Sequence, residues 1–248
     1  MKHALFTLGI LGMAFVIGCG GKNGAQNPAP AQVQPQPAAP PIKPEPLEEL
    51  AKPKTVNLAQ AINTANVNDV KVHLRNEPEV LKRPNEAGMY PIHLAALKGN
   101  GEVIQILLKD GADFNTPNKT GMCSIHLAAL KGHGEVIQIL LKAGADVNTP
   151  NAKMQATPLI DAATGGNVDA VRMLLDAKAN VNATDSNGRT ALMWATAKGH
   201  APVVRLLLER GADANKKSQT GWTALTYAKH QKNTELTELL GKQAPTAP

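Results

Sequence analysis

A few residues in this sequence have side chains suited to catalysis or metal binding: His93, His126, Cys123, Asp161 and Asp169. Histidines bind metals and transfer protons, a cysteine thiolate is a nucleophile, and a carboxylate pair can act as acid and base. Each of these roles needs partners at the right distance. The chain has two cysteines in all, too few for a disulfide framework or a four-cysteine zinc site.

The element that must position these residues is a sequence repeat with a period of 33. Residues 85–117 and 118–150 are identical at 26 of 33 aligned positions. Weaker copies continue the period through Leu159, Leu192 and Leu225. The spacing from Ile125 to Leu159 is 34 instead of 33, so one residue has been inserted between these two copies. Such a repeat is typical of stacked architectures.

Each repeat contains two short helical patterns. In 85–117 they run from Pro91 to Lys98 and from Glu102 to Lys109, with Gly99 between them and Gly111 after them. Glycine suits the left-handed residue that ends a helix. Neither helix could fold alone, but stacked pairs bury one continuous core. The pattern therefore predicts an all-α solenoid.

The period, together with the motifs Thr157-Pro158-Leu159 and Gly111-Ala112-Asp113, resembles the ankyrin repeat. The resemblance covers about 190 of 248 residues and implies stacked helix-turn-helix units joined by β-turn loops. It gives four full repeats, at 85–117, 118–150, 151–183 and 184–216. Two divergent caps, 54–84 and 217–243, complete a predicted domain over 54–243, and 244–248 is a tail.

The resemblance favours structural roles for the candidate catalytic residues. His93 and His126 occupy the histidine of the ankyrin Thr-Pro-Leu-His motif, which supports a turn by hydrogen bonding. Equivalent residues of stacked repeats lie about 10 Å apart, whereas ligands of one zinc must each reach within about 2.1 Å of it. Cys123 is expected to be a buried, inert thiol, and no substrate cleft is evident between Asp161 and Asp169. We therefore expect no enzyme activity, no cofactor and no metal site.

The first twenty residues are typical of an export signal. A short basic start precedes an apolar run of 14 residues, Ala4 to Ile17, which is shorter than the roughly 20 residues that span a bilayer. Val16-Ile17-Gly18-Cys19 resembles the lipobox of bacterial lipoproteins, whose cysteine is lipidated and becomes the N-terminus. We expect a signal peptide over 1–18 and a lipid anchor at Cys19. The alternatives are an ordinary cleaved signal and a short membrane anchor.

The next segment has the composition of a tether. Residues 20–53 hold nine of the 18 prolines and no aromatic residue, so they cannot bury enough apolar area to form a core. We expect residues 19–53, with the lipidated cysteine, to form a disordered or polyproline-like tether. It would average about 32 Å as a flexible coil and about 105 Å as polyproline II.

Ankyrin repeats bind other proteins along their concave side, through the loop tips and the residues after the Ala-Ala pair of the first helix. Carried onto this sequence, the resemblance implies a partner-binding face made of Met89, Leu97, Lys98, Met122, Leu130, Lys131, Met154, Gln155, Thr164, Arg189, Lys198 and Trp222. Apolar groups on a rigid face are typical of interface centres. The lysines favour an acidic partner, unless they only solvate this face.

Repeat 151–183 departs most from the pattern. Its loop has the inserted residue and lacks the glycine of the other loops, Asp161 replaces a leucine, and Lys178 replaces the glycine after the second helix. A lysine that keeps the left-handed backbone of that glycine costs about 1 kcal/mol. The repeat is either drifting or shaped for a ligand, and the sequence leaves both open.

The charge of the chain and its predicted export limit the classes of function to consider. Residues 54–248 carry 22 basic and 17 acidic side chains, with no basic stripe interleaved with aromatic residues, so nucleic-acid binding is not expected. We expect a monomeric, membrane-anchored protein–protein interaction module of the bacterial cell envelope; the alternative is an inhibitor or immunity protein that blocks a toxin or hydrolase. No aspartate follows Cys19, which by resemblance to a sorting rule favours the outer membrane, facing the periplasm, over the inner membrane or the cell surface.

Overall fold

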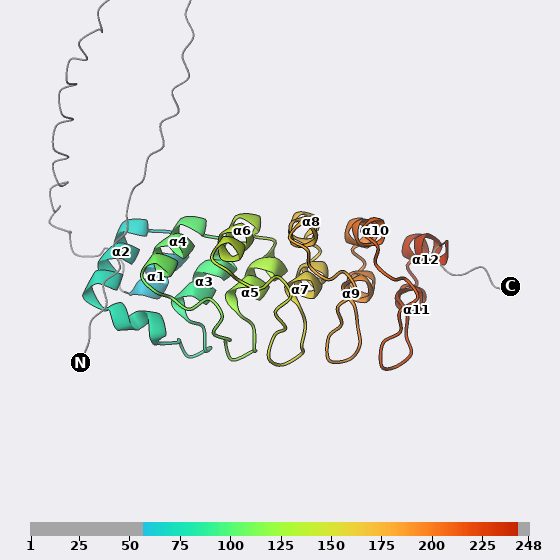
Figure 1. Ribbon diagram of the computed structural model, residues 1–248, viewed down its shortest axis with the longest axis horizontal. Coiled ribbons are helices and arrows are strands. Elements are labelled where there is room, and N and C mark those ends of the chain that lie inside the picture. Colours follow the sequence, from blue (N-terminus) through green and yellow to red (C-terminus); the bar gives the residue numbers. More distant parts are fainter. Residues whose placement is uncertain (1–56, 243–248) are drawn as a thin grey trace, which may run out of the picture. The chain divides into compact units, whose positions relative to one another are not determined.

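The computed structural model describes residues 57–242, in which twelve α-helices and one 3-10 helix occur and no β-strand. The helices alternate between two layers, so that each repeat gives one helix to each layer (Figure 1). The first layer contains α1 (Leu58–Asn63), α3 (Pro91–Lys98), α5 (Ser124–Lys131), α7 (Pro158–Gly165), α9 (Ala191–Ala197) and α11 (Ala224–His230). The second layer contains α2 (Val67–Asn76), α4 (Gly101–Lys109), α6 (Gly134–Lys142), α8 (Val168–Asp176), α10 (Ala201–Glu209) and α12 (Thr234–Gly241), and η1 (Pro78–Lys82) follows α2. The predicted all-α solenoid is confirmed.

Several predicted features lie outside the described residues. These are the signal peptide (1–18), the tether with Cys19 (19–53), the tail (244–248) and the two outer limits of the predicted repeat domain, 54 and 243, all of which stay predictions. Within residues 57–242, no helix has both the length and the apolar character needed to cross a membrane.

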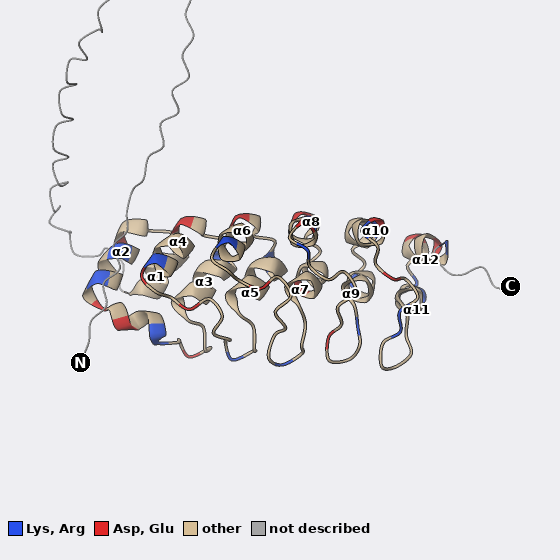
Figure 2. Cartoon of the chain, viewed as in Figure 1, with Lys and Arg blue, Asp and Glu red and all other residues tan. Residues whose placement is uncertain are grey.

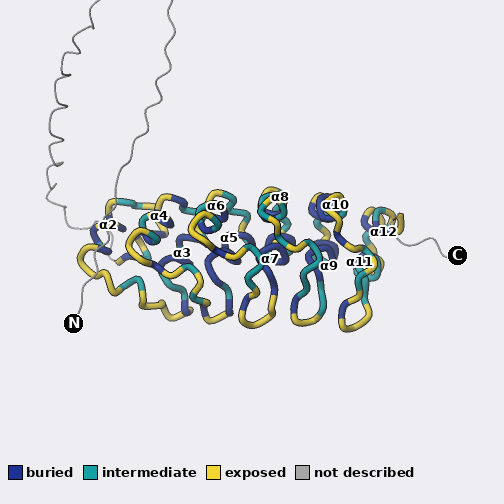
Figure 3. The backbone as a smooth tube through the Cα atoms, viewed as in Figure 1, coloured by how far each residue is buried: buried dark blue, intermediate teal, exposed yellow. Residues whose placement is uncertain are grey.

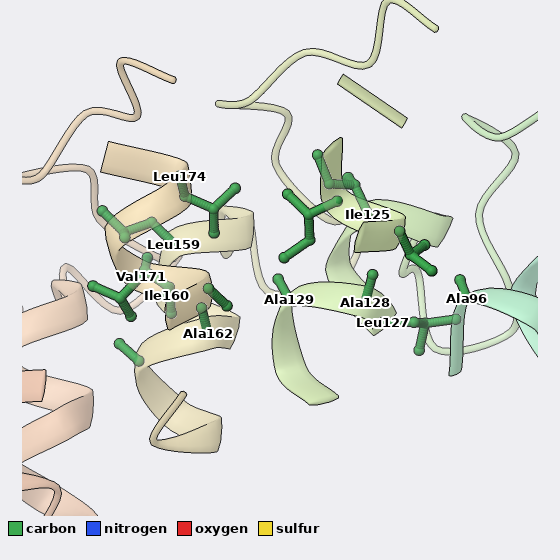
Figure 4. Close-up of a cluster of buried hydrophobic side chains, with 14 of the residues drawn as sticks. Ala96, Ile125, Leu127, Ala128, Ala129, Leu159, Ile160, Ala162, Val171 and Leu174 are labelled. Atoms are coloured by element: carbon green, nitrogen blue, oxygen red, sulfur yellow. The ribbon is translucent and has the colours of Figure 1, made fainter. Parts of the chain in front are cut away.

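The core lies where the two helix layers meet, and the loop tips and the outer side of the second layer are exposed (Figure 3). Leu107 on α4 and Leu140 on α6 are fully buried, as the helical pattern predicts. In the first layer, pairs of buried alanines leave little side-chain volume between neighbouring helices, which allows a close approach (Figure 4). These pairs are Ala95-Ala96, Ala128-Ala129 and Ala162-Ala163.

Local residues set the turn between the two helices of a repeat. Gly99 ends α3 with a φ of 76°, a left-handed conformation that glycine adopts without strain. Glycine is also required for space, because a Cβ at this position would lie 2.4 Å from Nδ1 of His133. The side chain of Asn100 then accepts a hydrogen bond from the Val103 N–H at 3.1 Å, which caps α4. With this cap α4 begins at Gly101, one residue before its predicted start.

The turn after α8 carries backbone strain. Lys178 follows this helix with a φ of 70°, the left-handed conformation expected if the lysine keeps the backbone of the glycine it replaces. The corresponding residues of three other repeats are Gly111, Gly144 and Gly211, with φ values of 88°, 98° and 86°. The local backbone of the repeat is therefore preserved in 151–183 although the glycine is lost.

Candidate partner-binding face

The loops that precede the first-layer helices are connected to one another. Within a loop, the Gly121 N–H donates to the Asn118 carbonyl at 2.8 Å, closing a tight turn. Between loops, the Ala152 N–H donates to the Gly121 carbonyl at 2.8 Å, and the Lys119 ammonium donates to the Glu86 carbonyl. Backbone groups that bond to the next loop fix its position. The loops, which all project to the same side of the stack (Figure 1), therefore form a row of defined geometry.

The inserted residue of repeat 151–183 lies in the turn of its loop. The Gln155 N–H donates to the Asn151 carbonyl at 3.0 Å, a turn one residue longer than the equivalent turn at Gly121. Gln155 has a φ of 55°, so it takes the left-handed conformation that glycine has elsewhere. The connection to the following loop is kept, because the Ser186 N–H donates to the Met154 carbonyl at 2.7 Å. The Met154 side chain is 40% exposed and is the only exposed large apolar side chain among residues 57–242.

The other apolar residues of the predicted face are less exposed. Met89, Leu97, Met122 and Leu130 are all partly buried, and the first three pack against the core. The sulfur of Met89 also accepts a hydrogen bond from the side-chain amide of Asn118 at 3.2 Å. Each side chain therefore offers only part of its area to a partner, and Met89 is also held by the following repeat.

Three lysines of the predicted face are exposed at the ends of first-layer helices: Lys98, Lys131 and Lys198. Among residues 57–242, none of the three forms an ion pair. Figure 2 shows acidic and basic residues mixed along the second layer. A cation at a helix C-terminus interacts favourably with the helix dipole, so these lysines have a structural role available beside that of contacting an acidic partner.

Arg189 belongs to a network that the sequence did not reveal. Its guanidinium lies 3.0 Å from Oδ2 of Asp185, whose side chain has no exposed area. The Trp194 indole N–H donates to the same oxygen at 3.0 Å, and the guanidinium carbon lies 4.0 Å from the Trp194 ring centroid. Three partners therefore fix one another. The sequence did contain a signal, because Asp185 and Trp194 stand where repeat 118–150 has Asn118 and Leu127.

Trp222, Thr164 and Gln155 complete the predicted face. The Trp222 ring packs against Tyr227 and His230, with centroids 5.0 and 5.2 Å apart. The Thr164 hydroxyl donates to the Ile160 carbonyl of its own helix at 2.8 Å, which leaves it less free to bond a partner. The Gln155 side-chain amide donates to the Asn151 carbonyl at 3.4 Å.

The two motif histidines support the turns, as the resemblance implied. In His126, Nδ1 accepts from the Cys123 N–H at 3.2 Å and Nε2 donates to the Thr149 carbonyl at 3.0 Å. His93 makes the same pair of contacts with Tyr90 and Thr116. Burial lowers the pKa of His126 to about 4 and also lowers that of His93. Both rings are therefore neutral at pH 7, with both nitrogens already engaged.

Of the remaining candidate groups, Cys123 is a buried free cysteine. The Cys123 thiol donates to the Asn115 carbonyl at 3.0 Å, and burial raises the pKa of the thiol, which lowers its reactivity. Between residues 57 and 242, no three His, Cys, Asp or Glu side chains are placed to hold a metal ion. The burial and the hydrogen bond of Cys123 fit the prediction that it is a buried thiol.

Asp161 is the least satisfied of these groups. It lies on α7 where Leu94 and Leu127 stand in the preceding repeats. Oδ2 is buried without a hydrogen-bond partner among the described residues, and so is the hydroxyl of Thr157 one turn earlier. Burial raises the pKa of the Asp161 carboxyl to about 7, because the charged form loses its hydration. The sequence showed the substitution of leucine but not this cost.

A family model described as "Ankyrin repeats (3 copies)" matches residues 58–151 and 150–218. The matched ranges cover more than half of the chain and extend from α1 to the loop before α11. Proteins with these repeats are generally protein–protein interaction modules. The chain belongs to the ankyrin-repeat family.

Proposed function

We propose that this protein is a membrane-anchored module of the bacterial cell envelope that binds a partner protein along its loops and first-layer helices. The observation that carries the proposal is a row of hydrogen-bonded loops that presents partly exposed apolar side chains beside unpaired lysines. Well-packed apolar groups supply most of the binding energy in an interface, and charges around them act on specificity and rate. The partner expected for such a face is a protein with an apolar patch bordered by acidic groups.

The anchor is proposed from sequence alone. Two or more acyl chains on Cys19 would hold the protein stably on a membrane, whereas one chain gives marginal binding. The absence of aspartate after Cys19 supports the outer membrane, facing the periplasm, as the location.

Replacing Cys19 with serine tests the anchor. The variant is expected either to be released as a soluble envelope protein or to remain an uncleaved precursor. Cys123→Ser is a matched control, because Cys123 is buried and its loss should leave membrane association unchanged. A processed Cys19→Ser chain that remains tightly membrane-bound would show that the anchor lies elsewhere.

Partner capture tests the binding function. The full chain, extracted from membranes in detergent, serves as bait, and the Leu97→Asp with Leu130→Asp variant gives the background. A protein retained by the unchanged chain and lost from the variant supports the proposed face. Activity of the captured partner then separates two roles, because a scaffold leaves it active and an inhibitor removes its activity in stoichiometric proportion.

A further inference from the structure

A groove on the second layer lies away from the predicted binding face. It has a volume of about 570 Å³ and is formed by α2, η1 and α4. Figure 1 shows α2 and α4 side by side at the N-terminal end of the stack. Leu74, Leu81 and Ile106 form its apolar part, and of these three only Leu74 is buried. The groove therefore exposes the apolar side chains of Leu81 and Ile106 in part.

The edges of this groove are positively charged. Lys71 and Arg75 lie one turn apart on α2, and Lys109 contributes from α4. All three are exposed and none has an ion pair among residues 57–242. Among the described residues that line the groove, Asp110 is the one acidic residue. The groove thus has a net positive rim around an apolar floor, which matches a segment with acidic residues between leucines.

The chain carries such a segment just before the first helix. Leu47-Glu48-Glu49-Leu50 places two glutamates between two leucines, and six residues lie between Leu50 and Asn57. The seven Cα-to-Cα steps from Leu50 to Asn57 span at most about 25 Å. The described chain begins beside the groove. Asn57 lines a neighbouring hollow together with Glu77 and Val80. Glu77 and Val80 are each followed in sequence by a residue that lines the groove, Pro78 and Leu81.

We propose that residues 47–50 dock in the groove between α2, η1 and α4, with the leucines on its apolar floor and the glutamates beside Lys71, Arg75 and Lys109. The docked segment covers the exposed side of α2 and η1 and attaches the end of the tether to the second layer. The occupant is the protein's own chain, because the connection is short and the charges are complementary. This inference does not depend on the proposed partner-binding face.

Zero-length crosslinking of the full chain in detergent tests the proposal. A carbodiimide activates a carboxylate, which then forms an amide bond only with an amine in direct contact. We expect amide bonds from Glu48 or Glu49 to Lys71 or Lys109, identified by mass spectrometry. The exposed Lys82–Glu79 pair, 3.3 Å apart, serves as the positive control in the same sample. Absence of the Glu48 and Glu49 products while the control pair reacts would overturn the proposal.

Two variants separate docking from chance contact. Arg75→Glu removes a rim charge without removing a reactive amine, and Leu50→Asp removes an apolar contact. Each should lower the yield of the crosslinks several-fold. Arg172→Glu on α8 is the matched charge control, because Arg172 is also exposed and lines a different groove, and it should leave the yield unchanged. Equal yields in all three variants would contradict docking.

Isotope mixing identifies which molecule occupies the groove. Equal amounts of ¹⁵N-labelled and unlabelled chains are combined before crosslinking. Products within a single labelled or unlabelled chain support the proposal. Products that join a labelled to an unlabelled chain would show that the segment of a second copy fills the groove, which would overturn docking within one chain.

Discussion

The imidazole of His133 donates from Nε2 to the backbone carbonyl of Leu97 at 3.0 Å, so the start of α6 is joined to the end of α3 in the preceding repeat. The same join recurs twice along the stack. Asn167 donates to the Leu130 carbonyl at 2.8 Å, and His200 donates to the Thr164 carbonyl at 3.1 Å. The last carbonyls of a helix lack partners inside the helix. These side chains supply the missing donors from the next repeat.

Loss of the His133 contact should weaken the stack. His133→Ala leaves the Leu97 carbonyl without this partner and is expected to lower the free energy of unfolding by about 1 kcal/mol. His133→Asn should retain most of the stability, because Asn167 makes the equivalent contact. Urea unfolding followed by circular dichroism measures both. If alanine and asparagine have equal effects, the hydrogen bond is not what stabilises this junction.

The strained turn at Lys178 provides a stabilising change. Lys178→Gly relieves a positive φ that costs about 1 kcal/mol for a residue with a Cβ, so the free energy of unfolding should rise by about that amount. Lys178→Ala is the control, since it removes the charge but keeps the Cβ. Thermal unfolding of both variants separates the two effects. A gain in the alanine variant equal to that of glycine would assign the effect to charge.

The Asp161 carboxyl should make stability depend on pH. Its pKa is raised to about 7 by burial, whereas in the unfolded chain it is about 3.9. Between these values the folded state holds a proton that the unfolded state has lost, so stability falls as pH rises from about 4 to 7. Asp161→Asn removes this dependence. The free energy of unfolding of the variant should match that of the unchanged protein at pH 4 and exceed it at pH 8 by an amount on the order of 2 kcal/mol. This is less than the full pKa difference implies, because Asp161 keeps partial exposure to solvent.

The buried histidines change stability with pH in the opposite direction, so their contribution must be separated from that of Asp161. His126, with its pKa lowered to about 4, is neutral when folded and protonated when unfolded below about pH 6.5. This contribution lowers stability as pH falls from about 6.5 to 4. Since both proteins contain the same histidines, the difference between their urea unfolding free energies at each pH reports Asp161 alone. A difference that does not change between pH 4 and 8 would show that the carboxyl stays ionised in the folded state.

The repeat made much of the fold predictable. Two nearly identical copies place α3 and α5 by alignment, and the motif position of His126 predicts its role because the turn it supports is local. Lys178 follows the same logic, since its backbone is set by the helix before it. Features governed by one repeat's geometry therefore carry over residue by residue.

The details of the binding face were less predictable because they depend on contacts between loops and neighbouring helices. The sequence located the insertion near Met154. It did not show that Gln155 adopts the left-handed conformation of the missing glycine, or that the Ser186 N–H bonds to the Met154 carbonyl and connects this loop to the next. The sequence placed Arg189 on the face but did not reveal its ion pair with Asp185 or its cation–π contact with Trp194. The periodicity of the sequence predicts which face of the stack a side chain lies on. It does not predict how much of that side chain's area the adjacent repeat covers.

The binding face itself is tested by paired substitutions. Leu97→Asp with Leu130→Asp places charges at the centre of the predicted apolar patch and should abolish partner binding at any salt concentration. Charge reversal at Lys98 and Lys131 should weaken binding most at low salt, because exposed charges act mainly on association rate and are screened by ions. Binding is measured by recovery of the captured partner over a range of salt concentrations.

The control for this experiment lies on the opposite layer. Gln105 and Gln138 are exposed on α4 and α6, so aspartates there add the same charges and should leave partner recovery unchanged. Because Leu97 and Leu130 are partly buried, circular dichroism must show that the double variant still folds. Met154→Asp gives a second test without that difficulty, since its side chain is 40% exposed. If the variants on the loops and first layer leave recovery intact while the glutamine pair destroys it, the partner binds the second layer instead.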